Sequence, residues 1–224
     1  MSILRSTLPR IAILALAAGL LAHAGGCTAE RMTQVIADDI VILRSFQTAD
    51  AIPRERLREA KAVAIIRETK GAAVVGASGG EGVLLKRLDG GKWSPPLAIE
   101  MSSGSFGLQI GGESREIVLL FFASSAVDRM LATGTFATGR AEGSFGDAFG
   151  RVPGSLPDQD VEAYVRLGGL FGGLSVNALG FGPSNKLNTA TYGSTWTVRR
   201  VLNGEVETPA GAMTLWKMLN EMER

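Results

Sequence analysis

Very few side chains in this sequence could perform covalent chemistry. Among the 224 residues there is one cysteine, Cys27, and one histidine, His23, and both lie near the start of the chain. If the first 26 residues are a removable signal, the remaining chain has no histidine and only the cysteine at its first position. Ser-His-Asp and Cys-His catalysis, histidine-ligated zinc and thiol redox chemistry are then excluded. Acid–base chemistry by Asp or Glu and amine chemistry by Lys remain.

Cys27 stands where bacterial lipoproteins carry their lipid-modified cysteine. Arg5 and Arg10 precede an apolar run over residues 11–22, a pattern typical of an export signal and too short for a permanent membrane span. The letters AGGC at residues 24–27 resemble a lipobox, in which the cysteine becomes the acylated first residue. We therefore predict that Cys27 is the lipid anchor of an exported protein.

This interpretation divides the chain into a signal, a short linker and one domain. We predict a lipoprotein signal peptide over residues 1–26, an anchor and linker over residues 27–30, and a single domain over residues 31–222. Thr28 after the cysteine, in place of aspartate, favours sorting to the outer membrane of a Gram-negative cell, facing the periplasm. The alternative is cleavage after Ala24 by ordinary signal peptidase, which would give a soluble periplasmic protein.

Basic side chains are the candidates for contact with anionic lipid headgroups. Removal of the two signal arginines leaves 21 basic residues against 22 acidic ones, a net charge of −1. A near-neutral chain has no general attraction to nucleic acid, so attraction to an anionic surface must come from a local patch. Such a patch forms if the predicted second helix and the hairpin after it share one face; the alternative is scattered surface charge. The candidates on these two elements are Arg56, Lys61, Lys86, Arg87 and Lys92.

Two other patterns are interpreted as structural. The glycine-rich segment GASGGEG, residues 76–82, lacks the Lys-Ser/Thr ending of a phosphate-binding loop, so we assign it to turns and close strand packing. Asp38 and Asp39 are expected on the polar face of a helix, and Glu113 and Glu116 beside an exposed turn. All four carboxylates are therefore expected to be solvated, and we predict no cofactor or metal site.

The elements that would hold these residues are helices followed by short strands. Apolar residues at helical spacing predict a helix over residues 30–48, and Pro53 opens a second helix near residues 54–61. From residue 62 onward, short apolar runs separated by glycine-rich turns predict an antiparallel meander. Residues 117–122 are apolar at every position, which predicts a strand covered on both faces.

The second half of the chain adds further helices to this sheet. We predict a helix over residues 124–132 with Ser125 as N-cap and Gly134 as its stop, a turn over residues 188–193, and a C-terminal helix over residues 209–222. The inward residues of the last helix are expected to be Met213, Trp216, Leu219 and Met222. The predicted fold is α+β: a curved antiparallel β-sheet, open or closing toward a barrel, flanked by short helices.

Several separated segments of the sequence are similar to one known family. The segments KGAAVVGASGGEGVLLKR, GKWSPPLAIEMSSGSFGLQIGG, AYVRLGGLFGGLSVNALG and NTATYG follow one another in the order found in the SYLF domain family. The resemblance implies a domain that binds membrane lipid, with no catalytic residues and no cofactor. In eukaryotic members a basic amphipathic N-terminal helix contributes to lipid binding, whereas the corresponding helix here carries Asp38 and Asp39.

These observations predict a non-enzymatic, lipid-anchored protein of the bacterial cell envelope. Its SYLF-like domain is expected to bind phospholipid through anionic headgroups, next to the membrane that holds its anchor. The alternative is an envelope protein-interaction or structural scaffold without lipid specificity. A hydrolase that uses carboxylates is the third possibility, and the lack of histidine disfavours it.

Overall fold

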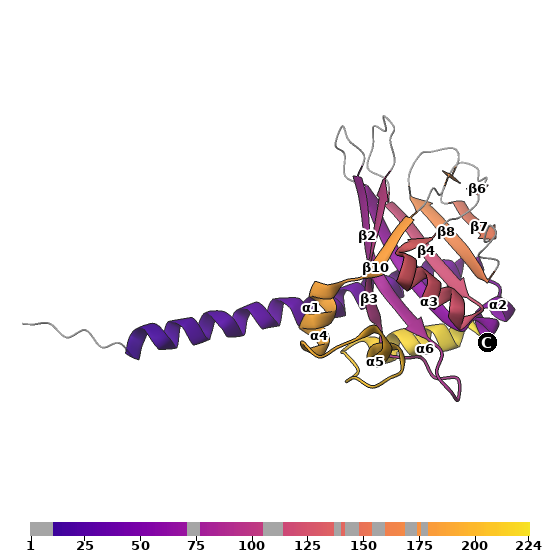
Figure 1. Ribbon diagram of the computed structural model, residues 1–224. Helices are drawn as coiled ribbons and strands as arrows, with labels where there is room; N and C mark the ends of the chain where they lie inside the picture. Colours follow the sequence, from indigo (N-terminus) through magenta and orange to yellow (C-terminus); the bar gives the residue numbers. More distant parts are fainter. Residues whose placement is uncertain are drawn as a thin grey trace, which may run out of the picture.

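The computed structural model describes residues 11–70, 77–104, 114–136, 140–141, 148–153, 160–168, 174–175 and 179–224. The fold is α+β, as predicted, with a large antiparallel sheet between helices (Figure 1). In chain order the elements are α1 (Ile11–Thr48), α2 (Arg54–Glu59), β1 (Ala62–Lys70), β2 (Ala77–Lys86), β3 (Leu97–Gly104), β4 (Ser114–Phe121), α3 (Ser124–Thr133), β5 (Thr135–Phe136), β6 (Arg140–Ala141), β7 (Ala148–Pro153), β8 (Val161–Gly168), β9 (Leu174–Ser175), β10 (Leu179–Pro183), α4 (Asn185–Tyr192), α5 (Val198–Leu202) and α6 (Ala212–Met222).

The main sheet has eight strands in the order β5-β10-β3-β2-β1-β4-β8-β7, and each neighbouring pair is antiparallel. Strands β1, β2 and β3 form the predicted meander, but β4 pairs with β1 and not with β3, so the meander does not continue to β4. Strand β6 pairs with β9 in a separate two-stranded sheet. Within the described residues the edge strands β5 and β7 do not pair with each other. The sheet is therefore open, and closure toward a barrel is wrong because the two-residue β5 ends the sheet on one side.

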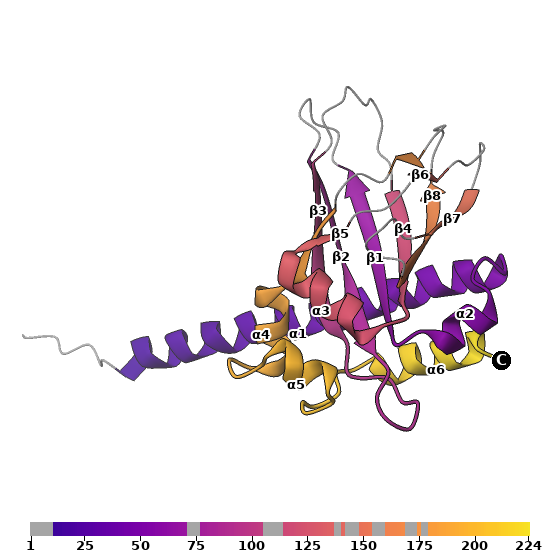
Figure 2. The ribbon, with the colours of Figure 1, turned by 45° about the vertical axis from the view of Figure 1, so that its right-hand side comes forward.

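Strand β4 lies at the centre of two hydrophobic layers. Ile117, Leu119 and Phe121 face one cluster of buried side chains, which also receives α3 and α5. Val118 and Leu120 alternate with them and face a second cluster, which receives α1, α2 and α6. Figure 2 shows α3 on one side of the sheet and α1 on the other. The predicted two-sided burial is confirmed for residues 117–121, whose five side chains are at most 2% exposed, whereas Phe122 follows the strand and is half-buried.

Helix α1 is longer than predicted, because it begins at Ile11 and includes the expected helix over residues 30–48. Its N-terminal part extends away from the sheet (Figure 1). Its C-terminal part packs on β1 and β2 and against α4 and α6 through fully buried side chains such as Met32, Leu43 and Phe46. No helix among the described residues is long and apolar enough to cross a membrane.

Two details of the predicted helices differ from the structure. Helix α3 begins at Ser124 with Ala123 as its N-cap and no side-chain cap, so Ser125 is not the cap, although Gly134 at φ 63° ends the helix as predicted. Met213 is 75% exposed, because an unbroken i+3 spacing drifts around a helix of 3.6 residues per turn. The buried face of α6 is formed instead by Ala212, Leu215, Met218, Leu219 and Met222.

The predicted turn over residues 188–193 is mostly helix α4. Ser184 caps this helix by accepting a hydrogen bond from the backbone of Leu187, and Gly193 at φ 80° ends it. Asn188 is fully buried in α4 and exchanges two hydrogen bonds with the backbone of Ala98, at 2.9 and 2.8 Å. The apparent turn residue thus joins α4 to β3.

The glycine-rich segment GASGGEG is strand over residues 77–82, not a turn. A Cβ atom added at Gly82 would lie 1.9 Å from the carbonyl oxygen of Ile65, whereas one at Gly79 would meet nothing closer than 4.0 Å. The close strand packing predicted for this segment is therefore confirmed at Gly82.

Candidate functional site

The first candidate site is the end of the sheet where α2 meets the hairpin between β2 and β3. The turn of this hairpin has Gly90 and Gly91 at φ 82° and 79°, as expected of the sequence Asp-Gly-Gly. The turn returns the chain to Trp93, which is 2% exposed and forms an isolated bridge with Arg87. Backbone hydrogen bonds then join this hairpin to the start of β1, since the Arg87 N–H donates to the carbonyl of Lys61 at 2.7 Å.

Arg87 is a structural residue at the centre of this end. Its guanidinium lies 4.0 Å from the centre of the Trp93 ring and donates to the carbonyls of Leu57 and Ala60 at the C-terminus of α2, at 3.2 and 3.1 Å. It also forms an ion pair with Glu223 at 2.6 Å. A cation that satisfies carbonyls at a helix end is stabilising. Arg87 therefore fastens α2, the hairpin and the end of α6 together.

Arg56 is likewise occupied by internal contacts. It forms ion pairs with Glu162 of β8 at 2.5 Å and with Glu59 at 2.6 Å, and its guanidinium lies 3.9 Å from the centre of the Phe122 ring. The hydrogen bond to Glu162 is the main reason why the pKa of Arg56 is raised. Glu162 in turn accepts a hydrogen bond from the hydroxyl of Tyr164 at 2.9 Å. Arg56 is thus part of a network that attaches α2 to β8.

The three lysine candidates are placed differently from one another. Lys61 and Lys92 are exposed, and they follow α2 and the hairpin turn on the segments that Arg87 joins. Lys86 is half-buried and points to the opposite face of the sheet from Arg87, because side chains alternate along a strand. Among the residues that the structure describes, none of these three ammonium groups forms an ion pair. The structure thus brings Lys61 and Lys92 to the end that Arg87 organises, and it separates Lys86 from them.

A second polar region, which the sequence did not predict, lies beneath α1. One charged residue from each of five neighbouring strands falls on one row across the sheet, because the strand register pairs Glu100 with Glu81, Glu81 with Arg67, Arg67 with Glu116 and Glu116 with Arg166. Arg166 and Glu116 form an ion pair at 2.6 Å. Since Glu116 is only 7% exposed, the prediction that it is solvated is wrong; Glu113 lies outside the described residues.

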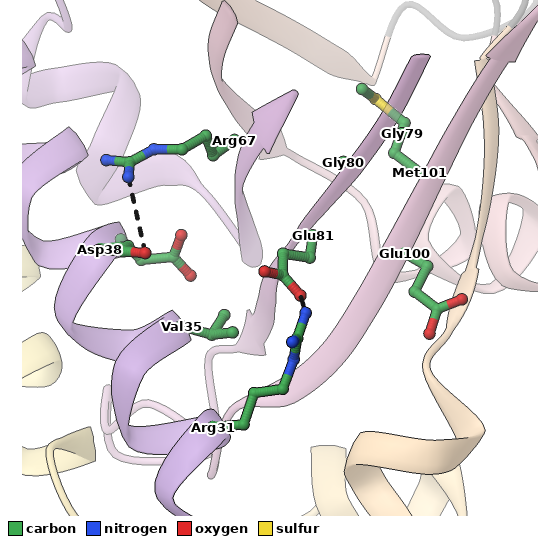
Figure 3. A pocket seen from close by; sticks show the side chains of 10 residues that line it. Arg31, Val35, Asp38, Arg67, Gly79, Gly80, Glu81, Glu100 and Met101 are labelled. Carbon is green, nitrogen blue, oxygen red and sulfur yellow. Dashed lines mark hydrogen bonds and ion pairs between the residues drawn. The ribbon is translucent and has the colours of Figure 1, made fainter. Parts of the chain in front are cut away.

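Helix α1 crosses this row and contributes its own polar side chains. Arg31 forms an ion pair with Glu81 at 2.7 Å, and Asp38 lies 3.6 Å from Arg67 (Figure 3). Asp38 is partly exposed, but Asp39 is 1% exposed, so its predicted place on a solvated face is wrong. The pKa of Asp39 is raised well above its ordinary value, first by burial and second by the neighbouring Asp38.

A cavity of about 450 Å³ opens between α1 and the strands β1, β2 and β3. Helix and strands contribute six ionisable side chains to its lining, and Val35 contributes an apolar side chain (Figure 3). The ionisable residues are Arg31, Asp38, Asp39, Arg67, Glu81 and Glu100. In the described part of the chain, no group of three or more His, Cys, Asp or Glu residues is arranged to hold a metal ion.

The predicted anchor, Cys27, falls within α1, upstream of Met32, which is the first residue of this helix described as buried. The cysteine is therefore five residues before the point where α1 packs on the sheet. The side chain of Cys27 lies outside what the structure describes, so its acylation stays a prediction.

Comparison with known proteins gives a consistent family. The family model described as Ysc84, Las17-binding protein actin regulator, matches residues 102–222, more than half of the chain. "LAS seventeen-binding protein 3" of Saccharomyces cerevisiae is 26% identical over 196 residues, which cover 85% of this chain and 43% of the yeast protein. "SH3 domain-containing YSC84-like protein 1" of Mus musculus is 30% identical over 176 residues, covering 75% of this chain and 51% of the mouse protein. This chain thus spans about half or less of the length of these relatives, and no solved structure matches it.

Proposed function

Because this chain belongs to the Ysc84 family of SYLF domains, we propose that it is a non-enzymatic, lipid-anchored protein of the cell envelope whose domain binds anionic phospholipid. The relatives are named as binding proteins and SH3-domain-containing proteins, and neither name describes an enzyme. If the signal peptide is removed, the remaining chain has no histidine, which is consistent with a role in binding and not in catalysis. The proposed anchor is Cys27, with the domain in the periplasm at the outer membrane.

One observation supports contact with anionic lipid. Arg58, Lys61 and Lys92 are exposed basic residues at the end of the sheet that Arg87 organises, and we call these three the hairpin patch. The arginine that joins their segments also neutralises Glu223, which removes one acid from this end. Each basic residue close to an anionic membrane contributes about 1 kcal/mol, and the contribution decays over about one Debye length. A patch of this size gives weak, reversible contact, which an acyl anchor would reinforce.

The test is binding of the protein to vesicles of defined charge. Cys27→Ser protein, which cannot be acylated, is sedimented with phosphatidylcholine vesicles that contain or lack phosphatidylglycerol. Lys61→Glu and Lys92→Glu should each weaken binding to the anionic vesicles several-fold, and higher salt should do the same. Lys186→Glu is the matched control, since Lys186 is exposed on α4, which lies apart from the hairpin in Figures 1 and 2.

The choice of variants follows from the structure. Reversal of Arg87 would break its contacts with α2 and α6, so lost binding by that variant would not distinguish lipid contact from damage to the fold. Binding that is unchanged by Lys61→Glu and Lys92→Glu, or indifferent to both salt and lipid charge, would favour an envelope scaffold without lipid specificity.

A further inference from the structure

The cavity beneath α1 is graded from an exposed entrance to a buried floor. At the entrance, the side chains of Arg31 and Glu81 are 61% and 47% exposed, and Glu100 is exposed as well. Asp39 also lines the cavity but is only 1% exposed. Val35 of α1, which is buried, contributes apolar surface. A ligand that fits must therefore have a polar group for the floor and a short apolar part behind it.

One oxygen atom of the Asp39 carboxyl group is buried without a hydrogen-bond partner. This atom, Oδ2, accepts no hydrogen bond, although the Val83 backbone bonds to the same carboxyl group. A buried polar atom without a partner costs about 1–3 kcal/mol relative to a satisfied one. The neighbouring carboxylate differs, because Asp38 is bonded by Gln34 at 3.1 Å and lies 3.6 Å from Arg67. A ligand that donates a hydrogen bond to Oδ2 would remove this penalty.

The charges of the lining indicate whether a ligand should be a cation or an anion. Four carboxyl groups and two guanidinium groups line the cavity, and both guanidinium groups already lie beside carboxylates, Arg31 at Glu81 and Arg67 at Asp38 and Glu116. The carboxyl groups left over are therefore Asp39 and Glu100, so the lining favours a cation, and more strongly once Asp39 loses its proton. A cavity of about 450 Å³ is far larger than a single metal ion, and the described residues hold no metal-binding cluster.

We propose that this cavity binds a primary ammonium group on a short carbon chain, with Asp39 as the acceptor at the floor. A primary ammonium supplies both the positive charge and the N–H donor that Oδ2 lacks, and its carbon chain would lie against Val35. A quaternary ammonium has the same charge but no N–H group, so it cannot satisfy Oδ2.

The ammonium group could come from the headgroup of an ethanolamine phospholipid or from a free amine. Arg31 at the entrance is four residues after Cys27, which is about 6 Å along a helix. If Cys27 is the anchor, the entrance lies next to the membrane surface. The lipid source thus rests on the proposed function, whereas binding of a free amine depends on the cavity alone.

The first measurement is isothermal titration of the protein with ethanolamine, and with choline as the matched control ligand. We expect ethanolamine to bind and choline to bind at least tenfold more weakly. Asp39→Asn should abolish ethanolamine binding, while Asp38→Asn, the same change at the adjacent residue, should reduce affinity by no more than about threefold. Gly79→Leu is a second variant, and it keeps both Asp38 and Asp39. A Cβ atom at Gly79 has open space, so a larger side chain there would fill the cavity and exclude the ligand.

The pH dependence gives a readout specific to Asp39. Because burial raises the pKa of Asp39, binding of a cation favours loss of its proton, and affinity should increase as the pH rises above the ordinary range of a carboxyl group. Other charged groups face the same space, and all of them are present in both wild type and Asp39→Asn, so a difference between the two pH profiles reports on Asp39. These groups are Arg31, Asp38, Arg67, Glu81, Glu100 and Glu116.

The second measurement separates the two sources. Vesicles of phosphatidylcholine with phosphatidylethanolamine are compared with pure phosphatidylcholine vesicles, using Cys27→Ser protein. If the protein binds the phosphatidylethanolamine vesicles more strongly, and Asp39→Asn removes this difference, the ligand is the lipid headgroup. If the protein binds free ethanolamine but does not distinguish the two kinds of vesicle, the ligand is a soluble amine. Equal affinity for choline and ethanolamine, equal effects of Asp38→Asn and Asp39→Asn, or no binding by either probe would overturn the proposal. None of these outcomes depends on the hairpin patch.

Discussion

Truncation of Phe121 tests the two-sided core on which the whole fold depends. The Phe121 side chain is 0% exposed and belongs to the cluster that contains Ala126, Val161 and Val201. A buried aromatic side chain removes about 150–250 Å² from water, and alanine retains only a small part of that area. At about 25 cal/mol per Å², the lost transfer free energy is about 3 kcal/mol, and the remaining cavity adds to it. Phe121→Ala should therefore lower the free energy of unfolding by about 3–5 kcal/mol.

Phe122 provides the matched control for this prediction, because it is the same residue type one position later. It is half-buried, and Arg56 covers its ring, so Phe122→Ala should cost about 1–2 kcal/mol. Urea unfolding followed by circular dichroism measures both. For a domain of this size, about 1 kcal/mol corresponds to 2–4 °C in Tm, so the Phe121 variant should melt at least about 6 °C lower. Equal effects of the two truncations, or a Phe121→Ala protein that melts within a degree of wild type, would refute the reasoning.

Three further predictions test separate parts of the molecule. Gly82→Ala should destabilise by about 3 kcal/mol or more in urea unfolding, because its Cβ would meet the Ile65 carbonyl oxygen, whereas Gly79→Ala should stay within about 0.5 kcal/mol; similar costs would contradict the close approach. The raised pKa of Asp39 means that the folded state holds this proton more tightly than the unfolded state, so stability falls as pH rises from about 4 through the raised pKa. Asp39→Asn should thus be more stable than wild type at pH 7, and the gap should close by pH 4. Cys27→Ser should move the protein from the membrane fraction to the soluble periplasm; if wild type carries no acyl mass, cleavage after Ala24 is correct.

The parts of the fold that the sequence predicts are those with a strong local pattern. Residues 117–122 are apolar at every position, a pattern that favours a strand covered on both faces, and residues 117–121 form such a strand. The Asp-Gly-Gly turn and the Gly134 stop are also local, since each needs positive φ angles that glycine provides. The helix α4 was missed for the opposite reason. Asn188 is typical of turns, and its two hydrogen bonds to Ala98, ninety residues earlier, are contacts that no local pattern indicates.

Part of the polar region beneath α1 could have been predicted from the sequence. Asp39 is four residues after Val35 and three before Ile42, so it shares the helical face of two side chains that are buried. The helical phase therefore places this carboxyl against the sheet, whereas its charge had suggested solvent. The row from Glu100 to Arg166 could not be found in this way, because its members meet only through strand register. Register depends on turn lengths and on packing that the local pattern does not specify.

The arrangement of the layers limits where this domain can bind anything. Helices cover both faces of the central strands, so a ligand or a membrane can reach these strands only at their ends or at a gap beneath a helix. The hairpin patch is at one end, and the cavity is the gap beneath α1. Five residues of β2 separate Glu81 at the cavity entrance from Lys86 near the hairpin, about 17 Å along the strand. This separation exceeds the Debye length at physiological salt, so lysine reversals in the patch should leave the affinity of the cavity for an ammonium group unchanged. The two proposals therefore stand or fall independently, and if Cys27 is the anchor, the cavity is the region nearer the membrane.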